Sequence, residues 1–153
     1  MKYSDKYNKY FSPDMMASIA KTQGLLFSFA EQQHYDMDVF IPVYLKSYFC
    51  NNEIDALESY FHWKTENVLM AQIEHEQAIP KLSKQNQSRY YDVFWMGKMY
   101  RLLVFATGFS SEKLYGFVDE DAMDKYAVSL EMYDLEDALS IILIDITSKM
   151  GNC

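Results

Sequence analysis

The stretch from Ser88 to Gly108 carries apolar residues on nearly every face of a 3.6-residue helix. The polar residues Asp92, Lys98 and Arg101 share no single face of that helix. Ser88 is a suitable N-cap and Gly108 a suitable C-terminal stop. Because a helix that is apolar all round is normally surrounded by neighbours, we expect 88–107 to be a buried central helix.

The composition agrees with a single all-α domain that spans residues 1–153. Half of the 153 residues are hydrophobic, which is enough for a substantial core. The chain has only 5 Gly and 3 Pro, too few for the many turns of an all-β protein. We therefore expect a compact bundle of about seven helices around the central one.

Several features bear on the compartment in which the chain works. Lys2, Asp5 and Lys6 interrupt the N-terminus where a signal peptide would be apolar. The longest apolar region, 93–106, is too short to span a membrane. Cys50 and Cys153 lack the spacing of a disulfide framework or a metal site, which is typical of a reducing environment. We expect a cytoplasmic protein with no membrane segment.

Capping residues divide the rest of the chain into further helices. We expect N-caps at Ser12, Asp38, Asn52, Thr65, Ser110 or Ser111, Asp119 or Asp121, and Asp134. The helix after Asp38 should end near Cys50, the next should run from Glu53 to about Trp63, and Pro80 should end the following one. The polar residues 81–88 should form an internal loop between two half-domains.

Two other segments allow more than one interpretation. Residues 1–10 alternate lysine and tyrosine at helical spacing, which favours a flexible lead-in whose tyrosines cover the core over a basic-aromatic binding arm. The order of parts in 20–75 resembles that in 96–147, which suggests two degenerate helical repeats.

The sequence predicts no catalytic, metal-binding or cofactor-binding residue. Glu74-His75-Glu76 resembles part of a zinc-protease motif, but position 79 is Ile rather than the second His. Cys50 has no basic neighbour in sequence that would lower its pKa, which favours a packing role. Gly97 gives up about 1 kcal/mol of helix propensity, so we expect a neighbouring helix to approach it closely.

The negative charge is concentrated in one segment, 112–137. The whole chain has a net charge of −8, and this segment alone holds nine acids and two lysines. Such a segment is either a solvated face or a docking surface for a basic protein. We take eight of its acids as candidate partner-binding residues: Glu112, Asp119, Glu120, Asp121, Asp124, Glu131, Asp134 and Glu136. The sign of the charge argues against direct binding to nucleic acid.

Two stretches resemble small uncharacterised all-helical proteins of clostridia and related Firmicutes. The first is 35–63, with the run 48–51, Asp55 and Tyr60-Phe61. The second is 94–133, with Phe94-Trp95-Met96-Gly97, Met99-Tyr100, Thr107-Gly108, Ser110-Ser111 and Leu114. This second stretch also resembles short domains encoded beside ADP-ribosyltransferase-like genes. The resemblance implies a mobile-element or toxin–antitoxin-like setting and assigns no catalytic residue.

Three functions fit these observations, and the first is preferred. It is a non-enzymatic interaction module, antitoxin-like or regulatory, that binds a basic partner through 112–137. The second is an inhibitor of a nucleic-acid enzyme, encoded by a phage or mobile element, whose acidic surface imitates nucleic acid. The third is an enzyme or small-ligand binder with a pocket between helices near Trp95, Gly97 and Tyr100. The sequence does not define the oligomeric state.

Overall fold

The computed structural model describes residues 3–83 and 87–151, and they form an all-α bundle as expected. Eight α-helices follow one another along the chain: α1 (Asp5–Asn8), α2 (Pro13–Gln32), α3 (Met37–Lys46), α4 (Glu66–Glu76), α5 (Val93–Thr107), α6 (Ser111–Phe117), α7 (Glu120–Leu130) and α8 (Leu135–Gly151). A π-helical turn (Cys50–Ile54) and a 3-10 turn (Tyr60–Trp63) lie between α3 and α4.

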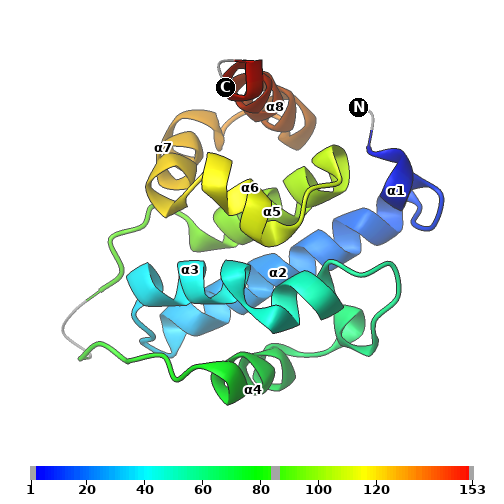
Figure 1. Ribbon diagram of the computed structural model, residues 1–153. Coiled ribbons are helices and arrows are strands. Elements are labelled where there is room, and N and C mark those ends of the chain that lie inside the picture. Colours follow the sequence, from blue (N-terminus) through cyan, green and yellow to red (C-terminus); the bar gives the residue numbers. More distant parts are fainter. Residues whose placement is uncertain (1–2, 84–86, 152–153) are drawn as a thin grey trace.

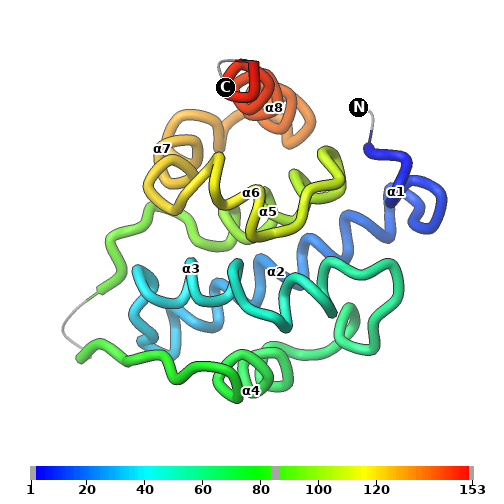
Figure 2. Tube along the Cα trace, in the orientation of Figure 1, coloured from blue at the N-terminus to red at the C-terminus, as the bar shows by residue number. Residues whose placement is uncertain are grey.

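The helices are stacked with α4 at one end and α8 at the other (Figures 1 and 2). Between these two ends, α2 and α3 lie nearer α4, and α5 and α6 lie nearer α8. Eleven of the fifteen residues of α5 are buried, so the expected central helix is confirmed. None of the described helices is long and apolar enough to cross a membrane.

Two glycines allow α2 and α5 to pack closely and antiparallel. A Cβ added at Gly97 would lie 2.8 Å from the carbonyl oxygen of Gln23 and 3.0 Å from the Cα of Gly24. A Cβ added at Gly24 would lie 2.8 Å from the carbonyl oxygen of Phe94. These are backbone atoms that cannot move aside, so the lost helix propensity is offset by close packing. The expectation for Gly97 is confirmed.

The start of the central helix differs from the prediction. It begins at Val93 rather than just after Ser88, because the Asp92 side chain accepts the amide of Trp95 at 3.0 Å. Ser88 instead accepts the amide of Tyr90 at 3.3 Å in a turn outside the helix. The end is as predicted, with Gly108 in the left-handed conformation at φ 74°.

Two predictions for residues 36–63 are wrong. Asp36, not Asp38, caps α3, and the helix ends at Lys46 rather than near Cys50. No continuous helix covers 53–63, because the chain turns at Asp55 and resumes only at the Ser59-capped 3-10 turn. Asp55 is 4% exposed, and its carboxylate accepts the backbone amide of Ser111 in the core. This hydrogen bond holds the chain around Asp55 against the core.

Of the other predicted caps, Thr65 and Asp134 precede α4 and α8 without a side-chain capping hydrogen bond to any described residue, whereas three others bond as predicted. Ser12, Ser110 and Asp119 each accept an amide in the first turn of the following helix. Helix α4 follows Thr65 but ends at Glu76, four residues before Pro80. Leu82 then donates its amide to the carbonyl of His34, within the expected loop region.

The N-terminal tyrosines partly cover the core. Tyr7 is fully buried and donates its hydroxyl to the carbonyl of Asp55 at 2.7 Å, whereas Tyr10 is 60% exposed. Ser4 is bonded through both its amide and its hydroxyl to the carbonyl of Phe105. The internal duplication remains a prediction.

Candidate functional site

The eight candidate acids lie on α6, α7 and α8 or in the residues that connect these helices, in the upper part of the molecule in Figure 1. Five are exposed: Glu112, Asp119, Asp121, Asp134 and Glu136. The other three are half-buried: Glu120, Asp124 and Glu131. Their hydrogen-bond partners show that most of them do not face solvent alone.

Three of these acids hold the segment that leads into α5. Asp121 pairs with Arg89 at 2.6 Å, Asp124 accepts the amide of Tyr91 at 2.9 Å, and Glu131 accepts the hydroxyl of Tyr91 at 3.0 Å. Arg89 also pairs with Asp38 of α3 at 2.8 Å. The acidic side chains of α7 and its C-terminal turn therefore anchor a connection within the molecule, which sequence reasoning did not predict.

Two further acids are engaged close to their own helices. Asp119 accepts the amide of Ala122 at 2.9 Å as the N-cap of α7. Glu120 accepts the hydroxyl of Tyr115, and burial together with this carboxylate raises the pKa of Tyr115 well above its usual range. These contacts give Asp119 and Glu120 structural roles beside any role in binding.

Exposed apolar side chains gather where α7 turns into α8. Met132 is 92% exposed, Val128 60% and Tyr133 53%. Exposed carboxylates follow them directly at Asp134 and Asp137. We call residues 128–137 the α7–α8 corner. Its apolar character was missed because Met132 and Tyr133 lie in a turn, where helical periodicity gives no information on exposure.

Among the residues that the structure describes, the corner retains unengaged acids, and so does α6 at the exposed Glu112. Within the described residues, the carboxylates of Asp134 and Asp137 make no hydrogen bond or ion pair. The neighbouring Asp92 carboxyl raises the pKa of Glu131, although the Tyr91 hydroxyl opposes the shift. The crowded carboxyl groups give the corner a negative field around an apolar centre.

A network of polar side chains is buried in the core, away from solvent. Arg101 is fully buried and pairs with the Asp55 carboxylate at 2.5 Å. The side-chain oxygen Oε1 of Gln23 accepts from Arg101 at 2.7 Å and from the Tyr44 hydroxyl at 2.6 Å. Ser111 donates its amide and its hydroxyl to Asp55 at 2.7 and 2.6 Å. We call these five residues the Arg101 network.

The Arg101 network joins α2, α3, α5, α6 and the turn after Ile54. Burial opposes the charge on Arg101, but the Asp55 carboxylate holds its pKa above the usual range. No buried side-chain nitrogen or oxygen of the described residues lacks a hydrogen-bond partner. A satisfied network of this kind, closed to solvent, positions helices and offers no atom to a substrate.

Cys50 and His62 lie beside the network and are buried, although His62 also lines a surface hollow with Tyr10 and Trp63. Burial, with a contribution from Asp55, raises the pKa of the Cys50 thiol to about 11, so the thiol is protonated near neutral pH. Burial lowers the pKa of His62, whose Nε2 lies 2.8 Å from the carbonyl oxygen of Ile54. Neither group is poised for nucleophilic or acid–base chemistry on an external substrate.

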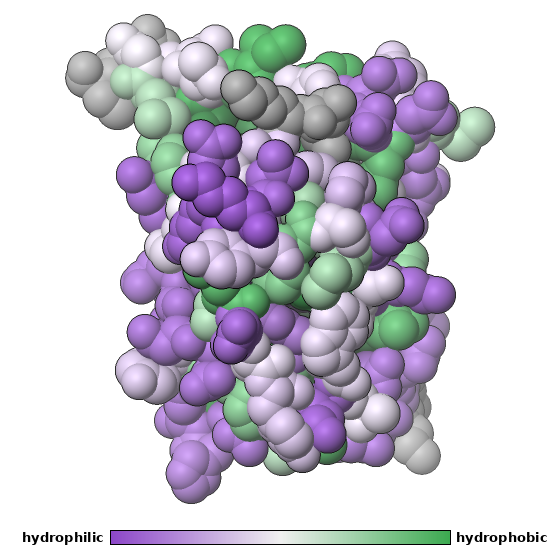
Figure 3. Space-filling view, turned by 90° about the vertical axis from the view of Figure 1, so that its right-hand side faces the viewer, coloured by the Kyte–Doolittle hydropathy of each residue, from purple (hydrophilic) through white to green (hydrophobic). Residues whose placement is uncertain are grey.

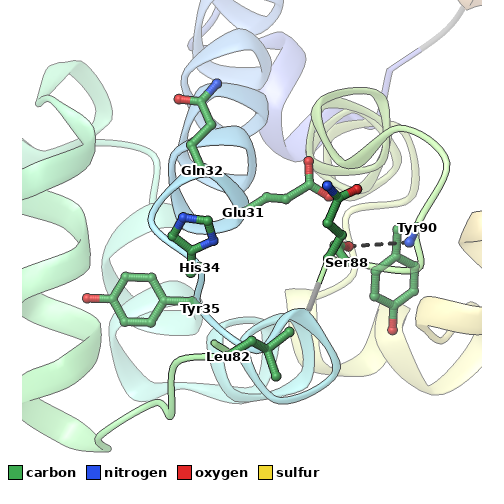
Figure 4. A pocket seen from close by; sticks show the side chains of 8 residues that line it. Glu31, Gln32, His34, Tyr35, Leu82, Ser88 and Tyr90 are labelled. Carbon is green, nitrogen blue, oxygen red and sulfur yellow. Dashed lines mark hydrogen bonds between the residues drawn. The ribbon is translucent and has the colours of Figure 1, made fainter. Parts of the chain in front are cut away.

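A cavity of about 340 Å³ lies at the C-terminal end of α2 (Figure 4). His34 lines it with a left-handed backbone at φ 64°, which is uncommon for a residue other than glycine. Tyr35 directs its hydroxyl away from the cavity and donates it to Glu74 at 2.6 Å. The Tyr90 hydroxyl is donated to Asp38. Both phenols are thus bonded to carboxylates, and the other polar side chains that line the cavity are Glu31, Gln32, His34, Gln87 and Ser88.

Of the α5 residues near the expected pocket, Trp95, Gly97 and Tyr100 are themselves buried, whereas their neighbours Phe94, Lys98 and Leu102 line a cavity between helices. Gly97 is covered by α2, Tyr100 is fully buried, and Trp95 is 5% exposed. The Tyr100 hydroxyl donates to the carbonyl of Val118 at 2.9 Å. This part of α5 is packed core.

The side of the molecule that carries α1 is a mosaic of hydrophobic and hydrophilic residues (Figure 3). A hollow of about 410 Å³ is lined by Tyr10, Tyr60 and Trp63, which are 60, 69 and 56% exposed. The Lys64 ammonium lies 3.9 Å from the centre of the Tyr60 ring. This aromatic rim has no charged frame comparable with that of the α7–α8 corner.

The described residues contain no group of three or more His, Cys, Asp or Glu side chains arranged to hold a metal ion. Comparison of the chain with protein-family models, with curated proteins and with solved structures gives no match.

Proposed function

We propose that this protein is a non-enzymatic interaction module that binds a basic protein through the α7–α8 corner. One observation carries the proposal: Val128, Met132 and Tyr133 are exposed within the ten-residue stretch 128–137, which also holds the exposed acids Asp134, Glu136 and Asp137. Exposed apolar groups rimmed by polar residues mark interaction sites, and Met and Tyr are enriched in interfaces.

The charge of the corner favours a basic protein over a second copy of this chain. In a symmetric dimer through the corner, Asp134 and Asp137 would face like charges, which disfavours self-association. The same negative field repels the phosphates of nucleic acid. A partner with an apolar pocket and a basic rim satisfies both parts of the surface.

The closed character of the core supports a role without catalysis. The groups best suited to chemistry, Cys50, His62 and Arg101, are buried and engaged with protein partners. The resemblance to proteins encoded near toxin-type genes supports an antitoxin-like or regulatory role for the complex. The product of a neighbouring gene is therefore the first partner to test, and a cytoplasmic setting is part of the proposal.

The test is titration of the adjacent gene product, after co-purification, with wild-type protein and two variants. Met132→Ser/Tyr133→Ser removes the apolar centre and should weaken binding at least tenfold, equal to about 1.4 kcal/mol. Ile144→Ser is the matched control, because Ile144 is an apolar side chain of α8 that is 65% exposed outside the corner. It should bind like the wild type.

Salt and competitors separate the remaining interpretations. Association should slow markedly between low salt and about 0.5 M salt, because salt screens the attraction between the acidic rim and its partner. If DNA or RNA displaces the protein from its partner, the complex is one of nucleic-acid mimicry. Unchanged binding by Met132→Ser/Tyr133→Ser would refute the proposed surface.

A further inference from the structure

A second cavity, of about 430 Å³, lies between α2, α5 and the start of α8. Its walls are largely apolar, with Ala17 and Ala20 from α2, Phe94 and Leu102 from α5, and Leu135 and Leu139 from α8. Cavities that bind small molecules typically measure about 300–1,000 Å³ and are mostly apolar with a few polar groups. This cavity meets both criteria.

The packing of α2 against α5 explains why space remains there. The two helices are pressed together at Gly24 and Gly97, where no side chain separates them. One to two turns nearer the start of α2, Ala17 and Ala20 are too small to fill the angle between α2, α5 and α8. The cavity is therefore a consequence of the same helix crossing that buries α5.

Two cations line this apolar cavity in a strongly acidic protein. Lys21 is exposed, and Lys98 is half-buried with its ammonium 5.0 Å from the centre of the Phe94 ring. Neither lysine forms an ion pair in the part of the chain that the structure describes. Both ammonium groups are thus available to an anionic ligand.

We propose that this cavity binds a single-chain amphiphile with one negative charge, a medium-chain carboxylate. The apolar walls accept the hydrocarbon chain, and Lys21 and Lys98 accept the carboxylate. Glu136 also lines the cavity, and its charge disfavours a head group with two negative charges. The walls offer too few hydrogen-bonding groups for a sugar or a nucleotide.

Decanoate, used below its micelle-forming concentration, is the probe for calorimetric titration of the wild-type protein. Decan-1-ol carries the same chain without charge, and decyltrimethylammonium carries it with the opposite charge. Decanoate should bind at least tenfold more tightly than either. Shortening the chain should weaken binding roughly fourfold per methylene removed, as expected when each methylene is buried.

Two variants test the two halves of the site. Lys21→Met/Lys98→Met keeps the aliphatic stems and should weaken decanoate binding at least tenfold while leaving decan-1-ol unchanged. The control Lys9→Met/Lys125→Met removes the same charge from exposed lysines that do not line the cavity, and it should bind like the wild type. Ala17→Phe places a ring at the exposed rim and should weaken both ligands.

Four results would overturn the proposal. The first is absence of decanoate binding to the wild-type protein. The second is equal binding of decanoate and decan-1-ol. The third is a loss of affinity in the control Lys9→Met/Lys125→Met that matches the loss in Lys21→Met/Lys98→Met. The fourth is unchanged affinity of Ala17→Phe for decanoate while its circular dichroism shows a folded protein.

Discussion

Replacing Arg101 by Met should remove a large part of the protein's stability. The substitution leaves the Asp55 carboxylate, which is 4% exposed, without its cation. Breaking one side of a buried ion pair costs about 3–5 kcal/mol, because the remaining charge is buried and unmatched. Ser111 still donates two hydrogen bonds to Asp55, and the side-chain oxygen of Gln23 still accepts the Tyr44 hydroxyl. We therefore expect a loss of about 4 kcal/mol in the free energy of unfolding.

That loss is large for a domain whose total stability is about 5–15 kcal/mol. It lowers the folding equilibrium constant roughly a thousandfold and the melting temperature by about 8–16 °C. Urea unfolding followed by circular dichroism at neutral pH measures it directly. Fluorescence of the two tryptophans provides a second probe of the same transition.

A double variant separates charge from packing. Arg101→Met/Asp55→Asn removes both charges and should be at least about 1 kcal/mol more stable than Arg101→Met alone, because no unmatched charge remains. If Arg101→Met has the same urea midpoint of unfolding as the wild type, the ion pair does not contribute to stability. If the double variant is no more stable than the single one, the loss comes from packing, and the argument from charge is wrong.

Three further predictions concern other parts of the fold. Gly97→Ala should lower the melting temperature despite its better helix propensity, because its Cβ meets the α2 backbone, whereas Gly116→Ala, with nothing within 4 Å, should raise stability by about 0.5–1 kcal/mol. His34→Gly should stabilise the protein by about 1 kcal/mol in urea unfolding, since φ 64° suits glycine, and an unchanged midpoint would show that the position is unstrained. Burial lowers the pKa of His62 below 6.5, so the unfolded chain takes up the proton at a higher pH than the folded protein does. Stability should therefore be full above about pH 6.5 and fall as the pH decreases below it. His62→Gln should show less of this decline when urea midpoints are compared between about pH 7.5 and 5.5, and an identical decline would assign it to other groups.

The sequence predicted the features that depend on local chemistry. The caps at Ser12, Ser110 and Asp119 follow from short side chains that accept nearby amides. The close contact at Gly97 follows from the cost of glycine in a helix, which some packing gain has to offset. The apolar character of 93–106 gave the central helix because such a surface can only be buried.

Features that depend on distant residues could not be read in the same way. Arg101 finds Asp55 and Gln23, 46 and 78 positions away, and nothing near Arg101 in sequence marks these partners. The one signal was that Arg101 shared no polar face with the other charges of its helix. Asp55 and Asp92 show the same effect. Asp55 accepts a hydrogen bond in the core, which ends the helix expected over 53–63. Asp92 caps α5 in place of Ser88, which makes that helix shorter than expected.

The acids of the segment 112–137 have different structural roles, which the net charge of the segment does not reveal. Its excess charge is plain in the sequence, but Arg89 and Tyr91, which engage three of the acids, lie at least 30 positions from them. For this reason we centre the proposed interface on the acids that follow Met132 in the chain. The structure also adds an apolar centre that a charge map alone does not contain.

The Arg101 network also determines how the chain comes apart. Its members come from positions 23, 44, 55, 101 and 111, so each half of the chain holds groups that the other half must satisfy. A state in which only one half is ordered would hold either an unmatched guanidinium or an unmatched carboxylate away from water. Such intermediates are disfavoured at equilibrium, and the two halves lose their structure together rather than in sequence. The buried charge thus acts against partial disorder, and it makes cooperativity a property of the whole chain.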